Sequence, residues 1–155
     1  MKIRSRKAIS PVIATVILVA VAITVAVAVA YWMGGIAGQY TKFEKIEVQS
    51  GYCTWNSTDT YWKIEMKLKN TGTAAATLTS AFINDVEIVT YNQDSVSANS
   101  TSTNMTTTTS ITSGDEITFN VYIDQGYATL SAGTTVNIKI HSAGGMDYIK
   151  LVELV

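Results

Sequence analysis

The chain has few of the residues that build stapled or metal-binding folds. It contains one cysteine and one histidine. A single cysteine excludes an intrachain disulfide, so we expect Cys53 to be a free, partly buried thiol, with an intermolecular bridge as the alternative. His141 has no cysteine, second histidine or acid cluster beside it in the sequence, which favours a solvated side chain over a metal ligand.

Recognisable catalytic motifs are missing as well. The chain has no nucleophile elbow, P-loop, dinucleotide fingerprint or zinc spacing, and it lacks the calcium-loop pattern of an EF-hand. Acids such as Asp115, Glu116 and Asp124 lie at the ends of expected strands, where turn formation explains them. We therefore expect no enzyme activity, no metal and no cofactor.

Charge is absent over one long stretch, from Ala8 to Thr41. This apolar run far exceeds the roughly 20 residues needed to cross a bilayer. Its Val-Ala alternation favours a strand in water, but only a helix satisfies the backbone of a lone segment in lipid. A helix over residues 9–41 is about 50 Å long, against a hydrocarbon core of about 30 Å. The surplus favours a helix that later packs against copies of itself.

Small residues recur along this expected helix. They keep helix faces thin enough for close backbone approach, and Gly34 and Gly38 form a small-xxx-small pair. The alternative for these two glycines is a flexible exit from the helix. The candidate helix-packing residues are Ala22, Ala26, Ala30, Gly34 and Gly38.

Four of the eleven basic residues precede the apolar run, at positions 2, 4, 6 and 7. Without them, seven basic residues remain against twelve acidic ones, a formal charge of −5. By the positive-inside rule, the N-terminus stays in the cytoplasm and the C-terminal portion lies outside. A basic cluster placed directly before an apolar run is poor evidence for nucleic-acid binding, and we expect none.

Positions 7–13 hold a basic residue, a small residue and the apolar start Ile-Ser-Pro-Val-Ile. This resembles the N-terminus of archaeal type IV pilins, which carry a class III signal peptide, and the resemblance is close over roughly residues 4–40. It implies that a membrane-embedded prepilin peptidase cuts between Ala8 and Ile9, with Lys7 as part of the processing site. Residues 1–8 are then a leader peptide.

The start of the mature helix also bears on this resemblance. Pro11 is tolerated in the first helical turn, where its missing N–H has no intrahelical partner, and Ser10 is the expected N-cap. Bacterial type IV pilins place a glutamate a few residues into the mature helix, whereas residues 11–15 contain no acid. The sequence therefore points to the archaeal branch.

The resemblance implies a structural subunit. Its precursor is inserted in the cytoplasmic membrane, and the pilus assembly machinery then packs many identical helices into an extracellular adhesive pilus. An archaellum filament subunit for swimming is the close alternative, and a single-pass membrane-anchored surface β-domain is the distant one. A conventional signal peptide cut at an Ala-x-Ala site within residues 26–30 is disfavoured, because the apolar run continues past that point.

After the helix, assigned to residues 9–42, residues 43–155 read as short strands separated by turn signals. Asn84-Asp85 predicts a hairpin. The fold class is therefore α+β: a long N-terminal hydrophobic helix followed by an all-β immunoglobulin-like sandwich, giving a ladle shape, with a barrel as the alternative sheet closure. The expected strands are 45–49, 61–69, 78–83, 86–91, 117–123, 136–141 and 148–155.

The last expected strand is apolar on both faces apart from Lys150 and Glu153. Buried central strands have this pattern. The alternative is that its outer face meets a neighbouring subunit.

Residues 92–113 are dominated by Ser, Thr and Asn. Such a composition buries little apolar surface, so we expect a long surface loop or a poorly ordered excursion. Two Asn-x-Ser/Thr sequons lie in it, at Asn99 and Asn104, and a third lies at Asn56. They are candidate N-glycosylation sites, and the hydroxyl-rich tract is a candidate for O-linked sugar.

Overall fold

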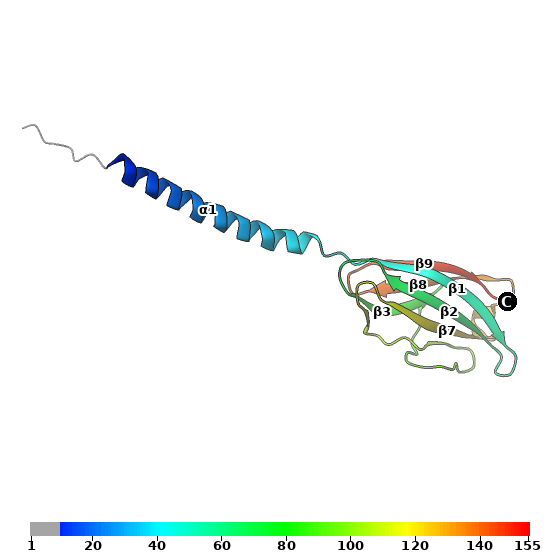
Figure 1. The fold of residues 1–155 in the computed structure, drawn as a ribbon. Coiled ribbons are helices and arrows are strands. Elements are labelled where there is room, and N and C mark those ends of the chain that lie inside the picture. The colour runs from blue at the N-terminus through cyan, green and yellow to red at the C-terminus, as the bar shows by residue number, and fades with distance from the viewer. Residues whose placement is uncertain (1–9) are drawn as a thin grey trace, which may run out of the picture. The chain divides into compact units, whose positions relative to one another are not determined.

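The computed structural model describes residues 10–155. They divide into two compact units, with the boundary between Thr41 and Lys42. Figure 1 shows one long helix in the first unit and a strand-rich second unit. The elements are α1 (Pro11–Tyr40), β1 (Ile46–Asn56), β2 (Tyr61–Asn70), β3 (Ala76–Ile83), β4 (Val86–Glu87), β5 (Thr101–Thr103), β6 (Thr109–Ile111), β7 (Glu116–Asp124), the 3-10 turn η1 (Tyr127–Thr129), β8 (Thr135–Ser142) and β9 (Asp147–Glu153).

Helix α1 begins at Pro11, as its ring geometry favours. Ser10 occupies the N-cap position, but its hydroxyl makes no capping hydrogen bond. Its carbonyl instead accepts hydrogen bonds from the N–H groups of Ile13, at 3.0 Å, and Ala14, at 3.2 Å. Ser10 therefore occupies the predicted N-cap position, but its side chain does not cap the helix.

The two threonine side chains within α1 bond to the helix itself. The Thr15 hydroxyl donates to the carbonyl of Val12 at 2.8 Å, and the Thr24 hydroxyl donates to that of Val21 at 2.9 Å. Such back-bonding satisfies both threonine hydroxyls without a partner outside the helix. The helix therefore has no polar stripe despite its two threonines.

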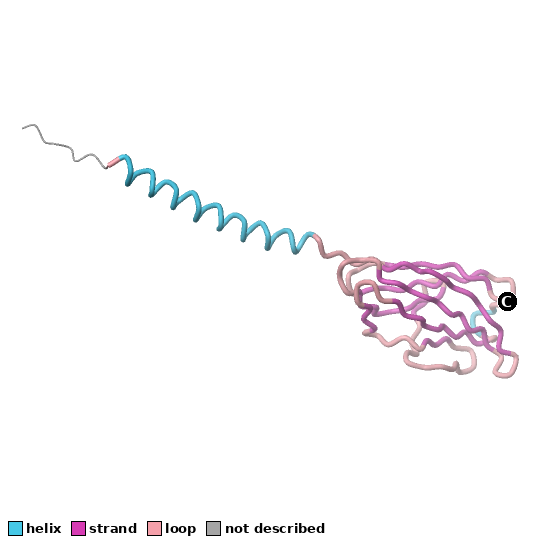
Figure 2. The backbone as a smooth tube through the Cα atoms, viewed as in Figure 1, coloured by secondary structure: helices cyan, strands magenta, loops and turns pink. Residues whose placement is uncertain are grey.

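The second unit is a sandwich of two antiparallel sheets. One sheet has the strand order β1-β2-β7-β5, and the other has the order β4-β3-β8-β9, with β6 also paired to β3. Figure 2 shows the long strands running side by side with loops gathered at their ends. The predicted class is confirmed: a long apolar helix followed by an all-β sandwich.

Strand β2 shows how the sequence pattern fixes the core. Its residues alternate strictly between buried and half-buried positions, because successive side chains in a strand point to opposite faces. The buried face carries Trp62, Ile64, Met66 and Leu68, as predicted. On the other face, Lys67 pairs with Glu116 of β7 at 2.8 Å.

The hairpin at Asn84-Asp85 is confirmed, but its second strand is shorter than predicted. Both turn residues have positive φ, 48° and 66°, as two-residue hairpin turns require. β4 then ends at Glu87. The next residue, Ile88, is fully buried, and its N–H still bonds to the Ala81 carbonyl of β3 at 2.8 Å.

The expectation of a simple surface loop over residues 92–113 is wrong in part. This tract contains β5 and β6, and it sends Met105 and Ile111 into the core at 2% and 1% exposure. Its buried hydroxyls are satisfied, since Ser102 donates to the carbonyl of Ser95 at 2.7 Å and Thr103 to that of Asn120 at 2.8 Å. Polar groups are buried at low cost when they are hydrogen-bonded.

The prediction of a buried central strand at the C-terminus is also wrong. β9 is an edge strand that pairs only with β8. Its side chains alternate, so Val152 is buried whereas Ile149 and Leu151 are 56% and 64% exposed. Its open side lies beside β1, where a Cβ built on Gly51 would be 3.2 Å from the Lys150 Cγ.

The order within the Ser/Thr/Asn-rich tract gives a stability test. We expect Met105→Ala to lower the free energy of unfolding by about 2–4 kcal/mol, because it empties a buried site. Thr107→Ala, at an exposed position two residues away, should change it by less than about 0.5 kcal/mol. Urea denaturation of the two variants checks this, and equal stabilities would mean that the tract does not pack.

Candidate functional site

The predicted processing site, Lys7, Ala8 and Ile9, lies outside the described residues. The candidate site that the structure does describe is the surface of α1. It is the one described helix that is long and apolar enough to cross a membrane, by length and composition. At about 1.5 Å per residue its 30 residues span about 45 Å.

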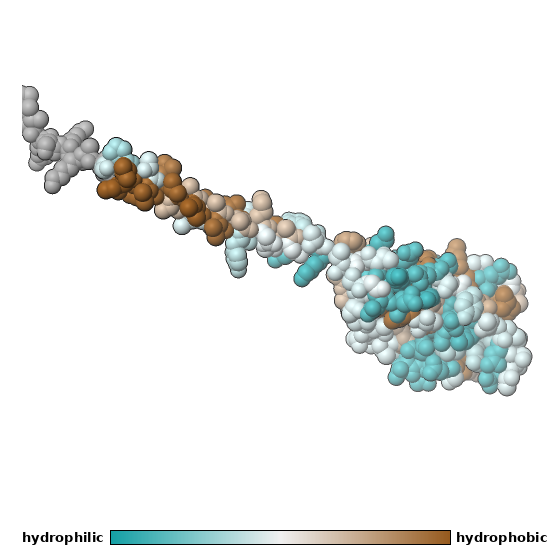
Figure 3. Space-filling view, viewed as in Figure 1, coloured by the Kyte–Doolittle hydropathy of each residue, from teal (hydrophilic) through white to brown (hydrophobic). Residues whose placement is uncertain are grey.

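No residue of α1 is buried. Figure 3 shows the most hydrophobic surface over the first half of the helix and paler surface toward its end. The paler part includes the amphipathic aromatics Tyr31, Trp32 and Tyr40, which are 87%, 64% and 86% exposed. Such side chains are typical of the level where a helix leaves the hydrocarbon for the headgroups.

The five predicted helix-packing residues all lie within α1. The helix continues through Gly34 and Gly38 to Tyr40, so these glycines are helical positions and not a loop after the helix. A Cβ built on either would meet no atom within 4 Å. The fold of this chain therefore does not require glycine at these two positions, and any such requirement comes from another molecule.

The β-sandwich holds the start of its own chain tightly. The N–H groups of Thr73 and Ala74 bond to the Phe43 carbonyl at 3.0 and 3.1 Å, and the N–H of Thr71 bonds to the Lys45 carbonyl at 2.8 Å. Gly72 makes this approach possible, because a Cβ there would lie 2.5 Å from the Phe43 oxygen. The segment 43–45 is therefore fixed to the turn between β2 and β3.

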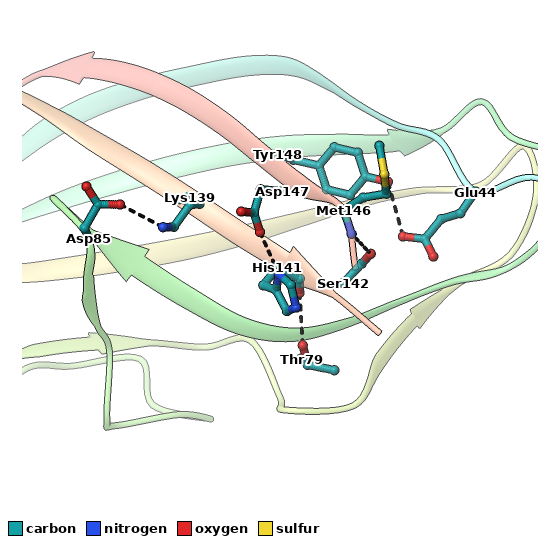
Figure 4. Close-up of polar contacts among 9 residues, drawn as sticks. All are labelled: Glu44, Thr79, Asp85, Lys139, His141, Ser142, Met146, Asp147 and Tyr148. Carbon is teal, nitrogen blue, oxygen red and sulfur yellow. Dashed lines mark hydrogen bonds and ion pairs between the residues drawn. The ribbon is translucent and has the colours of Figure 1, made fainter. Parts of the chain in front are cut away.

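A side chain from the far end of the sequence adds to this attachment. The Tyr148 hydroxyl of β9 donates to Glu44 Oε1 at 3.2 Å, as Figure 4 shows. Burial raises the pKa of Tyr148, so this phenol stays a donor at neutral pH. The contact joins residues 104 positions apart, which no sequence pattern indicates.

His141 has a partner that the sequence did not reveal. In β8 it lies directly opposite Asp147 of β9, and its Nδ1 is 2.6 Å from the Asp147 carboxylate. Figure 4 also shows Lys139 bonded to Asp85 at 2.7 Å. His141 is half-exposed, so the expectation of a solvated side chain holds, but the acid beside it follows from strand register.

The three sequons lie at separate places in the sandwich. Asn56 ends β1, Asn99 precedes β5, and Asn104 follows β5. Asn56 and Asn104 are half-buried, whereas Asn99 is exposed. Within residues 10–155, no cluster of three or more His, Cys, Asp or Glu side chains is placed to hold a metal.

One shallow hollow in the sandwich has an aromatic lining. It has a volume of about 380 Å³, and its lining includes Trp55, Trp62, Leu130, Ser131 and Val155. The two indoles are tilted against each other at 5.1 Å between ring centres. The Trp62 indole N–H donates to the Val155 carbonyl at 2.8 Å, so Trp62 holds Val155 against the sandwich.

These features define a class: an apolar helix of membrane-spanning length followed by an antiparallel β-sandwich. No family model matches the chain, and no curated protein matches it. Among solved structures, the chain is similar to the archaellum periplasmic stator protein FlaG from Sulfolobus acidocaldarius, with 14% identity and a TM-score of 0.47. The match covers 70% of this chain and 99% of that one. At this level of similarity, function has to be argued from the residues of the chain itself.

The close approach at Gly72 predicts a large effect from a small change. Gly72→Ala places a methyl group against backbone atoms of Phe43 and Lys45, and we expect the free energy of unfolding to fall by about 2 kcal/mol. The neighbouring Thr71→Ala removes only a hydroxyl contact of 3.4 Å and should cost less than about 0.5 kcal/mol. Thermal unfolding of both variants tests this, and equal melting temperatures would contradict it.

Cys53 is half-buried and free, as predicted. Burial raises the pKa of its thiol, so near pH 8 it holds its proton more than an ordinary cysteine does. We expect iodoacetamide to alkylate the folded protein at least about tenfold more slowly than the urea-unfolded protein at the same pH. Burial of the protonated Cys53 thiol stabilises the folded protein. This contribution is complete at pH values below the pKa of Cys53 in the unfolded chain, and it is lost as the pH rises through the higher pKa of Cys53 in the folded protein. Equal alkylation rates would show an accessible thiolate.

Proposed function

We propose that this chain is a membrane-anchored cell-surface protein of the archaeal type IV pilin kind. Helix α1 first holds the β-sandwich on the outer face of the cytoplasmic membrane. After removal of the leader, α1 packs against the same helix of identical subunits to form the core of an extracellular filament, whose outer wall is made by the β-sandwiches. The assembled filament serves adhesion.

The observation that supports the membrane step is the exposed and mostly apolar surface of α1. Every described side chain of the helix is exposed or half-exposed, and its threonines bond internally. In water such a surface costs about 25 cal/mol for each Å² of apolar area. A bilayer covers it, and the basic cluster before residue 8 orients the segment with its N-terminus inside.

The filament step has different support. The motif at residues 7–13 supports leader cleavage, and cleavage removes the four basic side chains that hold the N-terminus at the cytoplasmic surface. A bundle of identical helices then covers the same apolar area that the bilayer covered. Heterologous contacts between identical subunits that do not close into a ring give an open helical filament.

A membrane-anchored β-domain that never polymerises is the second candidate. It needs only a spanning helix and a separately folded domain, and the described residues supply both. The structure therefore supports this alternative more directly than it supports the filament, which also requires helices to pack against each other. The two candidates differ in where the mature protein is found and in how it begins.

The N-terminal residue of the protein in two cell fractions separates these candidates. Mass spectrometry of sheared surface material should give a start at Ile9 for a pilin-type subunit. An intact Met1 confined to membranes would establish the anchored protein and overturn processing, and a start near Tyr31 would mean a secreted β-domain. Loss of swimming on deletion of the gene would indicate an archaellum subunit in place of an adhesive pilin.

Helix packing can be tested without adding charge. Ala26→Leu keeps the helix apolar, so membrane insertion is retained, but it thickens a face expected to approach a neighbouring helix. We expect it to reduce the yield of sheared filament at least about tenfold. Val27→Leu, on a different side of the helix, adds a single methylene and is the matched control. If both variants reach wild-type levels in the membrane, and no strain, including the wild type, releases the protein in sheared material, the anchored protein is favoured.

A further inference from the structure

The three sequons of the chain are not equivalent acceptors once the sandwich has formed. Transfer to a folded protein requires an accessible asparagine amide and an accessible hydroxyl two residues later. We propose that Asn56 is the N-glycosylation acceptor of this protein, and that the folded sandwich withholds Asn99 and Asn104. This assignment rests on the proposed function, because it requires the sandwich to lie outside the membrane.

Asn56 lies at the tip of the hairpin between β1 and β2. Ser57 and Thr58, which complete its sequon, are both exposed. The Asn56 Oδ1 accepts the N–H groups of Thr58 at 2.9 Å and Asp59 at 3.2 Å, so the asparagine forms a local turn with its own sequon. Its amide nitrogen contacts only the exposed carboxylate of Asp59, at 3.2 Å, and that carboxylate can rotate away.

Asn99 fails at its hydroxyl. The residue two positions later, Thr101, is 6% exposed and belongs to β5, where it pairs with Ile123 of β7. The backbone N–H of Asn99 is bonded to Asp124 at 2.7 Å. Its side-chain oxygen also lies against Gly126, since a Cβ there would overlap it. Presenting this sequon to an enzyme requires β5 to leave the sheet.

Asn104 is held in place by its side-chain carbonyl, and the next residue of its sequon is buried. Its Oδ1 accepts the backbone N–H of Asn120 at 2.8 Å, which fixes the side chain against β7. The middle residue of the sequon, Met105, is 2% exposed in the core. The Thr106 hydroxyl is itself bonded to the Thr109 hydroxyl at 2.8 Å. All three positions of this sequon therefore take part in the fold.

The group transferred is a saccharide, and its donor is a glycosyl phosphate or diphosphate carried by a lipid. The Asn56 Nδ2 forms a bond to the anomeric carbon while the bond from that carbon to the phosphate oxygen breaks. The phosphate leaves with the electron pair of that bond, and one amide proton passes to a base of the transferase. Nothing is oxidised or reduced, and the carboxamide carbonyl is kept for the turn at Asn56.

The test uses the full chain, expressed in cells whose N-glycosylation of a surface reporter protein has been verified. Glycopeptide mass spectrometry should find sugar on the peptide that contains Asn56 and none on those that contain Asn99 or Asn104. Asn56→Gln and Thr58→Ala should each remove the added mass from the intact protein. Thr58→Ser keeps the hydroxyl and should retain it, and Asn104→Gln should leave it unchanged.

Surface labelling of lysines in intact cells separates the two ways to fail. If the lysines of the sandwich are labelled but Asn56 carries no sugar, or Asn104 carries as much sugar as Asn56, this assignment is overturned. The proposed location outside the membrane is then still supported. A sandwich that is not labelled overturns both. Because Asn56 is half-buried at the end of β1 and Thr58 is exposed in the hairpin turn, we expect their variants to fold, and unchanged melting temperatures check this.

Discussion

The structure depends on one requirement, that every backbone N–H and C=O group in the apolar segment be bonded within that segment. A bilayer supplies no hydrogen-bonding partner, and a helix bonds these groups internally, so the helical form of this Val-Ala sequence is the one that suits lipid. The same requirement applies to the side chains, and Thr15 and Thr24 meet it by bonding to carbonyls of the preceding turn. The result is a helix that is apolar over most of its surface and has no buried residue.

Because α1 buries none of its residues, the β-sandwich has to supply its own core and its own edge protection. All of the buried core comes from residues 46–154. The open side of β9 lies beside β1, and at the opposite edges Thr90 bridges to Ser102 in a short parallel contact. Covered edges matter here, because the proposed function crowds many identical sandwiches together, and exposed edges would pair without control.

The two units carry different parts of the proposed function. On α1, a spanning-length apolar surface suits either a bilayer or a bundle of like helices, and leader removal decides between them in our proposal. On the sandwich, the hairpin tip that holds Asn56 belongs to the end of β1 remote from the attached segment 43–45. A saccharide there is placed away from the point where the domain begins, and it does not disturb the contacts around Gly72.

The sequence by itself determined the helix, the hairpin at Asn84-Asp85, the class of fold and the positions of β2, β3, β7 and β8, because each follows from local periodicity or turn chemistry. It predicted only residues 45–49 of β1, which runs to Asn56. The tertiary structure decided what local patterns do not encode. The apolar run at residues 148–155 became an edge strand because pairing partners are set by topology. The Ser/Thr/Asn-rich tract 92–113 is ordered because its Met105 side chain is buried in the core of the sandwich. Strand register likewise brought Asp147 to His141, and folding left the three sequons with different exposure.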